Sequence, residues 1–151
     1  MTVDFKWSRL ADFDAFELHQ IIQAREAVFV VEQDCAYQET DDWDLQAWHL
    51  TVLVNGELAA YARIIGPDTH TRQASIGRVM TRAKFRGQGM GRALMEEAIK
   101  FIHNTYPGHD IRISAQVYLT SFYASLGFDV CGQAYEEDGI PHIAMLKVMQ
   151  K

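Results

Sequence analysis

Three alternating glycines, at residues 87, 89 and 91, separate a strand-like hydrophobic pattern from a helical one. Because glycine has no Cβ atom, the backbone can turn tightly here and point successive N–H groups at one anion. A helix that follows adds its unpaired N-terminal amides and the positive end of its dipole. The glycine spacing by itself fits either a pyrophosphate-binding loop or a plain glycine-rich turn.

Two common phosphate-binding loops do not match this segment. The pattern G-x-G-x-x-G would need Gly or Ala at Arg92 or Leu94, and the P-loop would need a Gly-Lys-Ser/Thr ending that is absent. The segment therefore excludes a Rossmann-type dinucleotide loop and a Walker-type nucleotide loop.

Hydrophobic periodicity around the glycines predicts one domain over residues 1–151. Apolar side chains alternate over residues 48–54 and 58–64, and Asn55-Gly56 between them is the signal of a type I′ turn, so a β-hairpin is expected. Apolar residues recur at helical spacing after Asp12, the expected N-cap, and again after the glycine segment.

Shorter patterns complete the predicted order, which is β-α-α-β-β-β-α-β-α-β-β. Further strands are expected at about residues 74–80, 111–115, 128–133 and 143–149, and a short helix at about residues 119–126. Three consecutive strands followed by alternating helices and strands indicate an α/β fold. Its single mixed sheet should have about seven strands, flanked on both faces by about four helices.

Composition excludes several classes of protein. The net charge is −6 and there is no Lys/Arg block, which argues against binding to nucleic-acid phosphates and mildly favours cationic small molecules. Cys35 and Cys131 form no C-x-x-C pattern, so we expect a reducing, cytoplasmic setting. The longest apolar run, Ala27 to Val31, is far too short to span a membrane, and no secretory leader is expected.

Several motifs resemble the GNAT N-acyltransferases. Arg86, Gly89 and Gly91 match the family's pyrophosphate loop, Arg/Gln-x-x-Gly-x-Gly/Ala, and SFYASLGF at residues 121–128 is similar to its Phe-Tyr-x-x-x-Gly-Phe segment. REAVFVVEQDCAY at residues 25–37 and YEEDGIPHIAM at 135–145 resemble the small bacterial ElaA-type subgroup. The resemblance implies a GNAT fold, an acyl-CoA donor such as acetyl-CoA, and N-acetyltransferase activity toward a primary amine, with no metal.

The resemblance also implies which residues hold the donor. The backbone amides of the glycine segment should face the pyrophosphate of coenzyme A, and the preceding strand should offer backbone groups to the pantetheine arm and the thioester. The expected cofactor-binding residues are Val79, Thr81, Arg86, Gly87, Gln88, Gly89, Met90, Gly91 and Arg92. Among them, the N–H of Val79 is the expected donor to the thioester oxyanion.

Tyr123 is the expected catalytic residue. A phenol with a pKa near ~10 is protonated at neutral pH and can give its proton to a departing thiolate. The competing interpretation is a core tyrosine packed with Phe122 and Phe128. An asparagine present in many family members is missing nearby, and Gln116 stands in that region.

Other polar residues allow two interpretations each. Arg78 lies in an apolar strand, where it either forms a structural ion pair or contacts substrate. Three candidates could accept the proton of the amine, Glu32, His49 and His142, and each could equally be an ordinary solvated or hydrogen-bonded residue. Carboxylates and tryptophans either attract a cationic amine or form a solvated loop: Glu39, Asp41, Asp42, Trp43, Asp44 and Trp48. Their spacing lacks the Gly and terminal Glu of a calcium loop.

Two other functions compete with amine acetylation. Arg25 to Phe29 (REAVF), with the downstream acidic residues, also resembles the N-terminal half of the longer acyl-homoserine-lactone synthases. A non-catalytic acyl-CoA sensor would bind the donor without transferring it. The sequence leaves open the amine acceptor, the acyl length, the general base and the oligomeric state, with a homodimer as one option.

Overall fold

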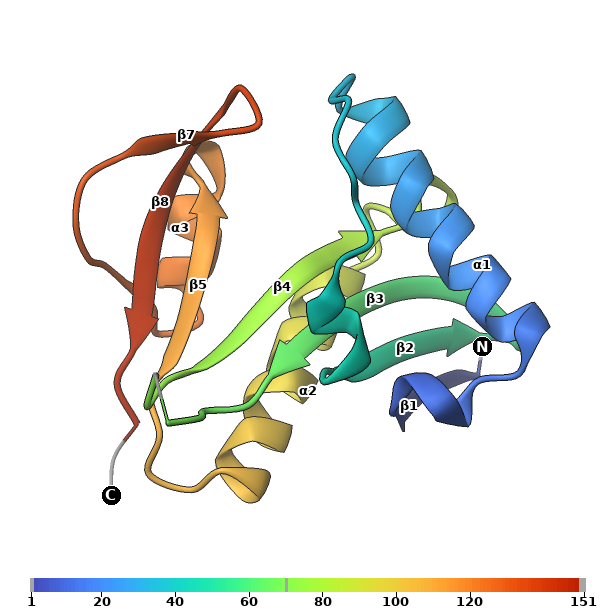
Figure 1. The fold of residues 1–151 in the computed structure, drawn as a ribbon, viewed down its shortest axis with the longest axis horizontal. Helices are drawn as coiled ribbons and strands as arrows, with labels where there is room; N and C mark the ends of the chain where they lie inside the picture. Colours follow the sequence, from blue (N-terminus) through green and yellow to red (C-terminus); the bar gives the residue numbers. More distant parts are fainter. Residues whose placement is uncertain (1, 70, 150–151) are drawn as a thin grey trace.

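The computed structural model describes residues 2–69 and 71–149, and all the strands in these residues belong to one mixed sheet (Figure 1). The strands are β1 (Val3–Ser8), β2 (Trp48–Val54), β3 (Glu57–Ile65), β4 (Ala74–Thr81), β5 (Ile111–Gln116), β6 (Asp129–Val130), β7 (Tyr135–Glu137) and β8 (Ile140–Lys147). Their spatial order is β1-β2-β3-β4-β5-β8-β6, and β7 pairs with β8. The α/β fold with a mixed sheet is therefore confirmed.

Helices cover both faces of the sheet, as expected (Figure 1). They are α1 (Ala15–Glu26), which continues as a π-helical segment (Ala27–Glu32), α2 (Met90–Thr105) and α3 (Thr120–Ala124). Short 3-10 turns span Leu10–Asp12, Asp42–Leu45, Ala83–Phe85 and Val117–Leu119. No helix of the described residues is both long and apolar enough to cross a membrane.

Two apolar clusters bury the two faces. The helical stripe of α2 lies against the central strands, with Leu94, Met95 and Ile102 fully buried in the larger cluster. On the other face, Ile21 and Ala24 of α1 pack in a smaller cluster with side chains of β3 and β4. Burying one stripe of each helix against the sheet removes apolar area from water and fixes the layers.

The hairpin predicted from Asn55-Gly56 is confirmed. β2 and β3 pair antiparallel, and both turn residues have positive φ, +51° and +82°, as a type I′ turn requires. A second hairpin, β7–β8, was not predicted; it turns at Asp138-Gly139, with φ of +53° and +78°. Because this turn lies inside β7–β8, the last strand begins at Ile140 rather than near residue 143.

The expected start of the first helix was wrong by two residues. Asp12 ends a 3-10 turn, where its carboxylate accepts the N–H of Arg9 at 2.9 Å, and Phe13 is extended. Asp14 is the actual N-cap of α1, accepting from the N–H of Glu17 at 2.7 Å in a capping box. Phe16, expected on the buried stripe, is 84% exposed.

The two halves of the sheet separate between β4 and β5. These parallel strands pair only at Ala74 with Ile111 and at Ser75 with Arg112, and beyond these residues they diverge (Figure 1). A bulge in β4 adds to the distortion, because Arg78 and Val79 together oppose one residue of β3, and Arg78 has a φ of +50°. The C-terminal half of β4 is therefore not paired with β5.

Candidate functional site

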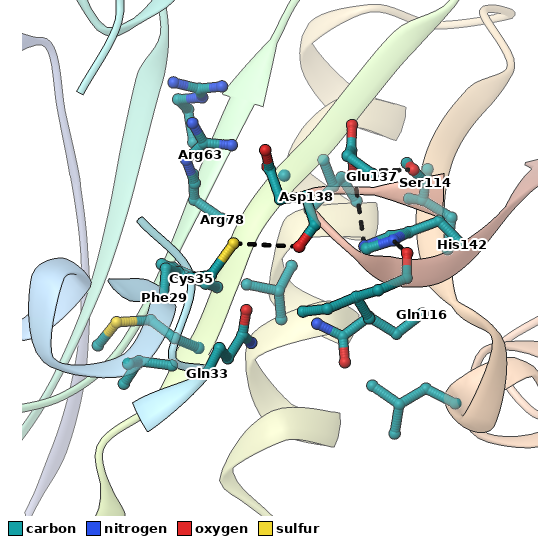
Figure 2. A pocket seen from close by; sticks show the side chains of 18 of the residues that line it. Phe29, Gln33, Cys35, Arg63, Arg78, Ser114, Gln116, Glu137, Asp138 and His142 are labelled. Carbon is teal, nitrogen blue, oxygen red and sulfur yellow. Dashed lines mark hydrogen bonds and ion pairs between the residues drawn. The ribbon is translucent and has the colours of Figure 1, made fainter. Parts of the chain in front are cut away.

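A cleft of about 850 Å³ occupies the space between the diverging strands. One wall comes from the π-helical segment, the loop after it, and β4 with its bulge; the other comes from β5, α3 and the β7–β8 turn (Figure 2). Five of the residues expected from the sequence line this one cleft: Val79, Thr81, Arg86, Gly91 and Tyr123.

The glycine segment forms the N-terminus of α2 at one end of the cleft. Gly87 and Gly89 both have a φ of +76°, a conformation that side chains with a Cβ rarely adopt, and Gly89 is the N-cap of the helix. A Cβ built on either residue would meet nothing within 4 Å. The glycines are therefore needed for backbone conformation and leave an open cradle over the helix N-terminus, which suits an anion.

The remaining residues of the segment lie beside the cleft. The side chain of Met90 is buried in the larger apolar cluster, so only its backbone is available to a ligand. Arg92 donates to the hydroxyl of Ser125, the C-cap of α3, and pairs with Glu96 at 3.6 Å. Gln88, next to Gly87, is exposed.

Arg86 already has a partner in this structure. Its guanidinium makes two hydrogen bonds to the carboxylate of Glu32, at 2.6 and 3.0 Å, and its Nε donates to the carbonyl of Thr81. The hydrogen bond and the charge of Glu32 raise the pKa of Arg86. This pair ties the π-helical segment to the glycine loop, so Glu32 serves as an anion partner rather than as a free base.

The bulge of β4 is held by a charged network that the sequence showed only as separate residues. Arg78 donates from Nε to Glu39 at 3.0 Å and from Nη2 to the Glu39 carbonyl at 2.8 Å. The structural ion pair proposed for Arg78 is thus confirmed. Arg78 also lines the cleft, with 22% of its side chain exposed.

Arg25 is the centre of that network. It is 2% exposed and donates to Glu39 at 2.7 Å and to both oxygens of Asp44 at 2.8 and 3.2 Å. Arg63 of β3 donates to Asp41 at 2.7 Å and to Asp44 at 3.1 Å. Three guanidiniums, with Arg78, therefore balance three carboxylates, so the cluster carries no net charge.

This neutrality corrects the idea that the acidic loop attracts a cation. Glu39 and Asp44 are each 7% exposed, and their charges are used inside the protein. Neither tryptophan lines the cleft. Trp43 is 46% exposed. The ring of Trp48 contacts Phe101, and the Cζ atom of Arg9 lies 3.9 Å from its centre. Buried charges are normally paired in this way.

Tyr123 projects from α3 into the wall of the cleft. It is 8% exposed, and Phe122 and Phe128 contact its ring edge to face. Burial, with a smaller contribution from Tyr118, raises the pKa of Tyr123 to about 12. The ring is thus a core residue, as one interpretation held, and Tyr123 also lines the cleft. Its role as an acid stays a prediction.

The far end of the cleft is built by residues that the sequence analysis had mostly missed. Ser114 and Gln116 come from β5, Glu137 ends β7, and Asp138 begins the β7–β8 turn (Figure 2). Cys35 reaches across and donates to the carbonyl of Asp138 at 3.2 Å. The Asp-Gly pair at residues 138–139 was the sequence signal that could have predicted this turn.

Of the two histidine candidates for the base, one lies outside the cleft and the other lines it. His49 is 1% exposed and lies outside the cleft; its Nδ1 contacts the hydroxyl of Tyr61 at 2.5 Å and its Nε2 contacts the carbonyl of Asp44 at 3.0 Å. Burial lowers the pKa of His49. His142, by contrast, lines the cleft beside Gln116, its partner in the β5–β8 ladder.

No group of three or more His, Cys, Asp or Glu side chains in residues 2–69 and 71–149 is placed to hold a metal ion. The polar groups that line the cleft include backbone amides, a phenol, carboxylates and an imidazole.

Comparison with known proteins shows the family and supports the fold. The acetyltransferase (GNAT) domain family matches residues 16–149. Protein ElaA of Escherichia coli is 38% identical over 146 residues, covering 94% of this chain and 95% of that one, and its crystal structure superposes with a TM-score of 0.90. An acyl-CoA N-acyltransferase from Pseudomonas aeruginosa is 39% identical, with a TM-score of 0.92 over 97% of this chain and 100% of that one.

The AHL synthase LasI shares the fold alone, at 14% identity and a TM-score of 0.77 over 96% of this chain and 89% of that one. The family match covers most of the described sheet and the whole cleft. The chain is therefore a member of the GNAT acetyltransferase family, and it is ElaA-like.

Proposed function

We propose that the protein is an acyl-CoA-dependent N-acetyltransferase that moves an acetyl group directly to a primary amine. One observation carries the proposal: a single cleft joins the glycine-lined N-terminus of α2, the bulge of β4 and the phenol of Tyr123. These are the three parts that amide formation from a thioester needs, namely an anchor for the donor, an oxyanion donor and a proton for the leaving sulfur.

The donor end fits coenzyme A by its backbone. The amides of residues 87–92 lie at the helix N-terminus, where the open sides of Gly87 and Gly89 allow a pyrophosphate to approach closely. Arg86 can add a charge-assisted hydrogen bond only by sharing its guanidinium with Glu32. Bound acetyl-CoA would supply the acetyl group as a thioester.

The middle of the cleft supplies the polar groups for acyl transfer. The bulge interrupts regular pairing at Val79, so its N–H is our choice of oxyanion donor, worth about 3 kcal/mol to the transition state. Tyr123 would protonate the departing sulfur. Burial raises the pKa of the phenol, but it also raises the pKa of a thiol in the same cleft. The difference between the two pKa values therefore changes little, and proton transfer from the phenol to the thiolate stays feasible.

Direct transfer fits the chain better than an acyl-cysteine intermediate. Cys35 lines the cleft, but burial, together with the charges of Asp138 and Asp34, raises the pKa of its thiol. Its sulfur also donates to a backbone carbonyl. A thiol in this state carries little thiolate and is a poor nucleophile.

The charge balance of the cleft favours a cationic acceptor. The arginine–carboxylate network is neutral, so the carboxylates of Glu137 and Asp138 give the far end of the cleft a negative charge. An alkyl ammonium would be attracted to this end of the cleft, whereas an anionic acceptor would be repelled.

Calorimetric titration with acetyl-CoA tests the donor site. We expect micromolar binding, about −8 kcal/mol, in the wild-type protein and its loss in Gly89→Val. Gly56→Val is the matched control, because Gly56 has the same kind of positive φ and the same open side but lies in the β2–β3 turn. Equal affinity in all three proteins would refute the assignment.

Product analysis then separates the three functions. Acetyl transfer to a primary amine with release of coenzyme A supports the proposal. Turnover only with S-adenosylmethionine and an acyl-carrier protein would indicate an acyl-homoserine-lactone synthase, and tight donor binding without transfer to any amine would indicate a sensor.

A further inference from the structure

His142 and Glu137 lie next to each other at the far end of the cleft, where the acceptor amine is expected to bind (Figure 2). His142 is 8% exposed, and its Nδ1 lies 2.7 Å from the carbonyl oxygen of Ile140. A carbonyl can only accept a hydrogen bond, so Nδ1 must carry the ring proton. The neutral ring then has its lone pair on Nε2.

That lone pair lies next to a group that can stabilise a proton on it. Nε2 is 3.5 Å from a carboxylate oxygen of Glu137, longer than a formed hydrogen bond but close enough for an ion pair. The side chain of Glu137 is 53% exposed, so solvent screens its charge, but the carboxylate is near enough to pair with an imidazolium on this ring.

The surroundings of the ring limit what else could act there. The ring of Tyr135 of β7 stacks on His142, and Gln116 of β5 is its partner in the ladder. Ser114 hydrogen-bonds the hydroxyl of Tyr135 and contacts Glu137 at 3.5 Å. Glu137 is thus the charged group that these contacts bring to His142.

The other two candidate bases are already engaged. Glu32 is bound twice by Arg86, and both nitrogens of His49 are bonded outside the cleft. An alkyl amine needs a base, because at pH 7 only about one molecule in 2,500 is neutral. We infer that Nε2 of His142 accepts the proton of the acceptor amine and that Glu137 stabilises the resulting imidazolium; this rests on the proposed acetyl transfer.

The proton balance closes with the residues of the cleft. Nε2 takes one proton from R–NH3+, and the amine lone pair then forms the C–N bond to the acyl carbon. The C–S bond breaks with its electron pair on sulfur, which takes the proton of Tyr123. The second proton on nitrogen returns to the Tyr123 phenolate through water, and the imidazolium releases its proton to solvent.

Two acceptors that differ in protonation test the role. We expect His142→Gln to lower kcat/KM for benzylamine, an ammonium at pH 7, about 100-fold or more, and that for aniline, already neutral at pH 7, only slightly. Glu137→Gln should lower the benzylamine value at most about fivefold. Equal losses with both amines would overturn the base role.

A matched control is available in the same chain. Nδ1 of His109 lies 2.6 Å from the carbonyl oxygen of Arg72, the same type of contact, but His109 does not line the cleft. His109→Gln should leave both amines unaffected. Each variant must also bind acetyl-CoA like the wild-type protein, which shows that it is folded.

Nitrogen-15 NMR of the histidine rings gives a result that does not depend on turnover. We expect His142, assigned by its loss in His142→Gln, to be protonated on Nδ1 and unprotonated on Nε2 at pH 8. A proton on Nε2 at that pH would overturn the inference. If the wild-type protein acetylated neither amine, the proposed function would be in doubt, and the NMR result would still decide the state of His142.

Discussion

Replacing Arg25 with Met tests whether the charged network holds the fold together. Methionine keeps most of the apolar stem and removes the guanidinium, so the packing of α1 is largely retained. The change deletes the hydrogen bonds to Glu39 and Asp44 and leaves both carboxylates buried, each 7% exposed.

The remaining arginines reduce the loss of stability expected from this change. Arg78 still pairs with Glu39, and Arg63 still pairs with Asp44, so neither carboxylate is left wholly without a partner. Breaking a buried ion pair costs 3–5 kcal/mol, and we therefore expect the lower end, about 3 kcal/mol. For a chain of 151 residues, that corresponds to a fall in Tm of about 6–12 °C.

Urea unfolding followed by circular dichroism gives the free energy of unfolding directly. Lys6→Met is the matched control, because it breaks the Lys6–Glu17 pair, whose side chains are 46% and 37% exposed, and should cost less than about 1 kcal/mol. If Arg25→Met lost no more stability than Lys6→Met, the network would not be a structural element and this reasoning would be wrong.

Two further predictions concern Tyr123 and Asp44. Tyr123→Phe keeps the packed ring and removes the acid, so kcat should fall about 100-fold or more while acetyl-CoA affinity in calorimetry is unchanged; an unaltered kcat would eliminate the acid role. For Asp44, burial favours the neutral acid, but hydrogen bonds and charge from Arg25 and further hydrogen bonds from Asp41 and Arg63 prevail and lower the pKa from 3.8 to about 2. Because the pKa is lower in the folded state, the Asp44 carboxylate stabilises the protein above pH 4, and this stabilisation is lost as the pH falls toward 2. The free energy of unfolding should therefore fall by about 2 kcal/mol between pH 4 and pH 2. Asp44→Asn should remove this pH dependence and flatten that part of an acid-unfolding curve.

Local chemistry explains which parts of the fold could be predicted. The backbone conformation at Asn55-Gly56 and at the alternating glycines could be predicted from residue type, because few other residues adopt a positive φ. The first helix was misplaced because Asp12 and Asp14 are equivalent as caps in sequence, and only the geometry of the preceding 3-10 turn distinguishes them. The β7–β8 hairpin was missed although Asp138-Gly139 carries the same kind of signal.

The site divides in the same way. Tyr123 and the glycine segment could be found from motifs, since each lies within one continuous stretch of chain. Cys35 and Asp138, 103 residues apart, meet only through the fold. The choice of His142 over His49 needed the tertiary structure, because sequence does not show which ring nitrogen already has a partner.

The sequence by itself determined the alternating strands, the turn at Asn55-Gly56 and the glycine-lined helix start, since these follow from periodicity and allowed φ values over a few residues. The tertiary structure alone decided where β4 and β5 separate and which charges neutralise each other. Pairing of charges and opening of a cleft depend on distances between residues far apart in the chain, and only the packed sheet fixes those distances.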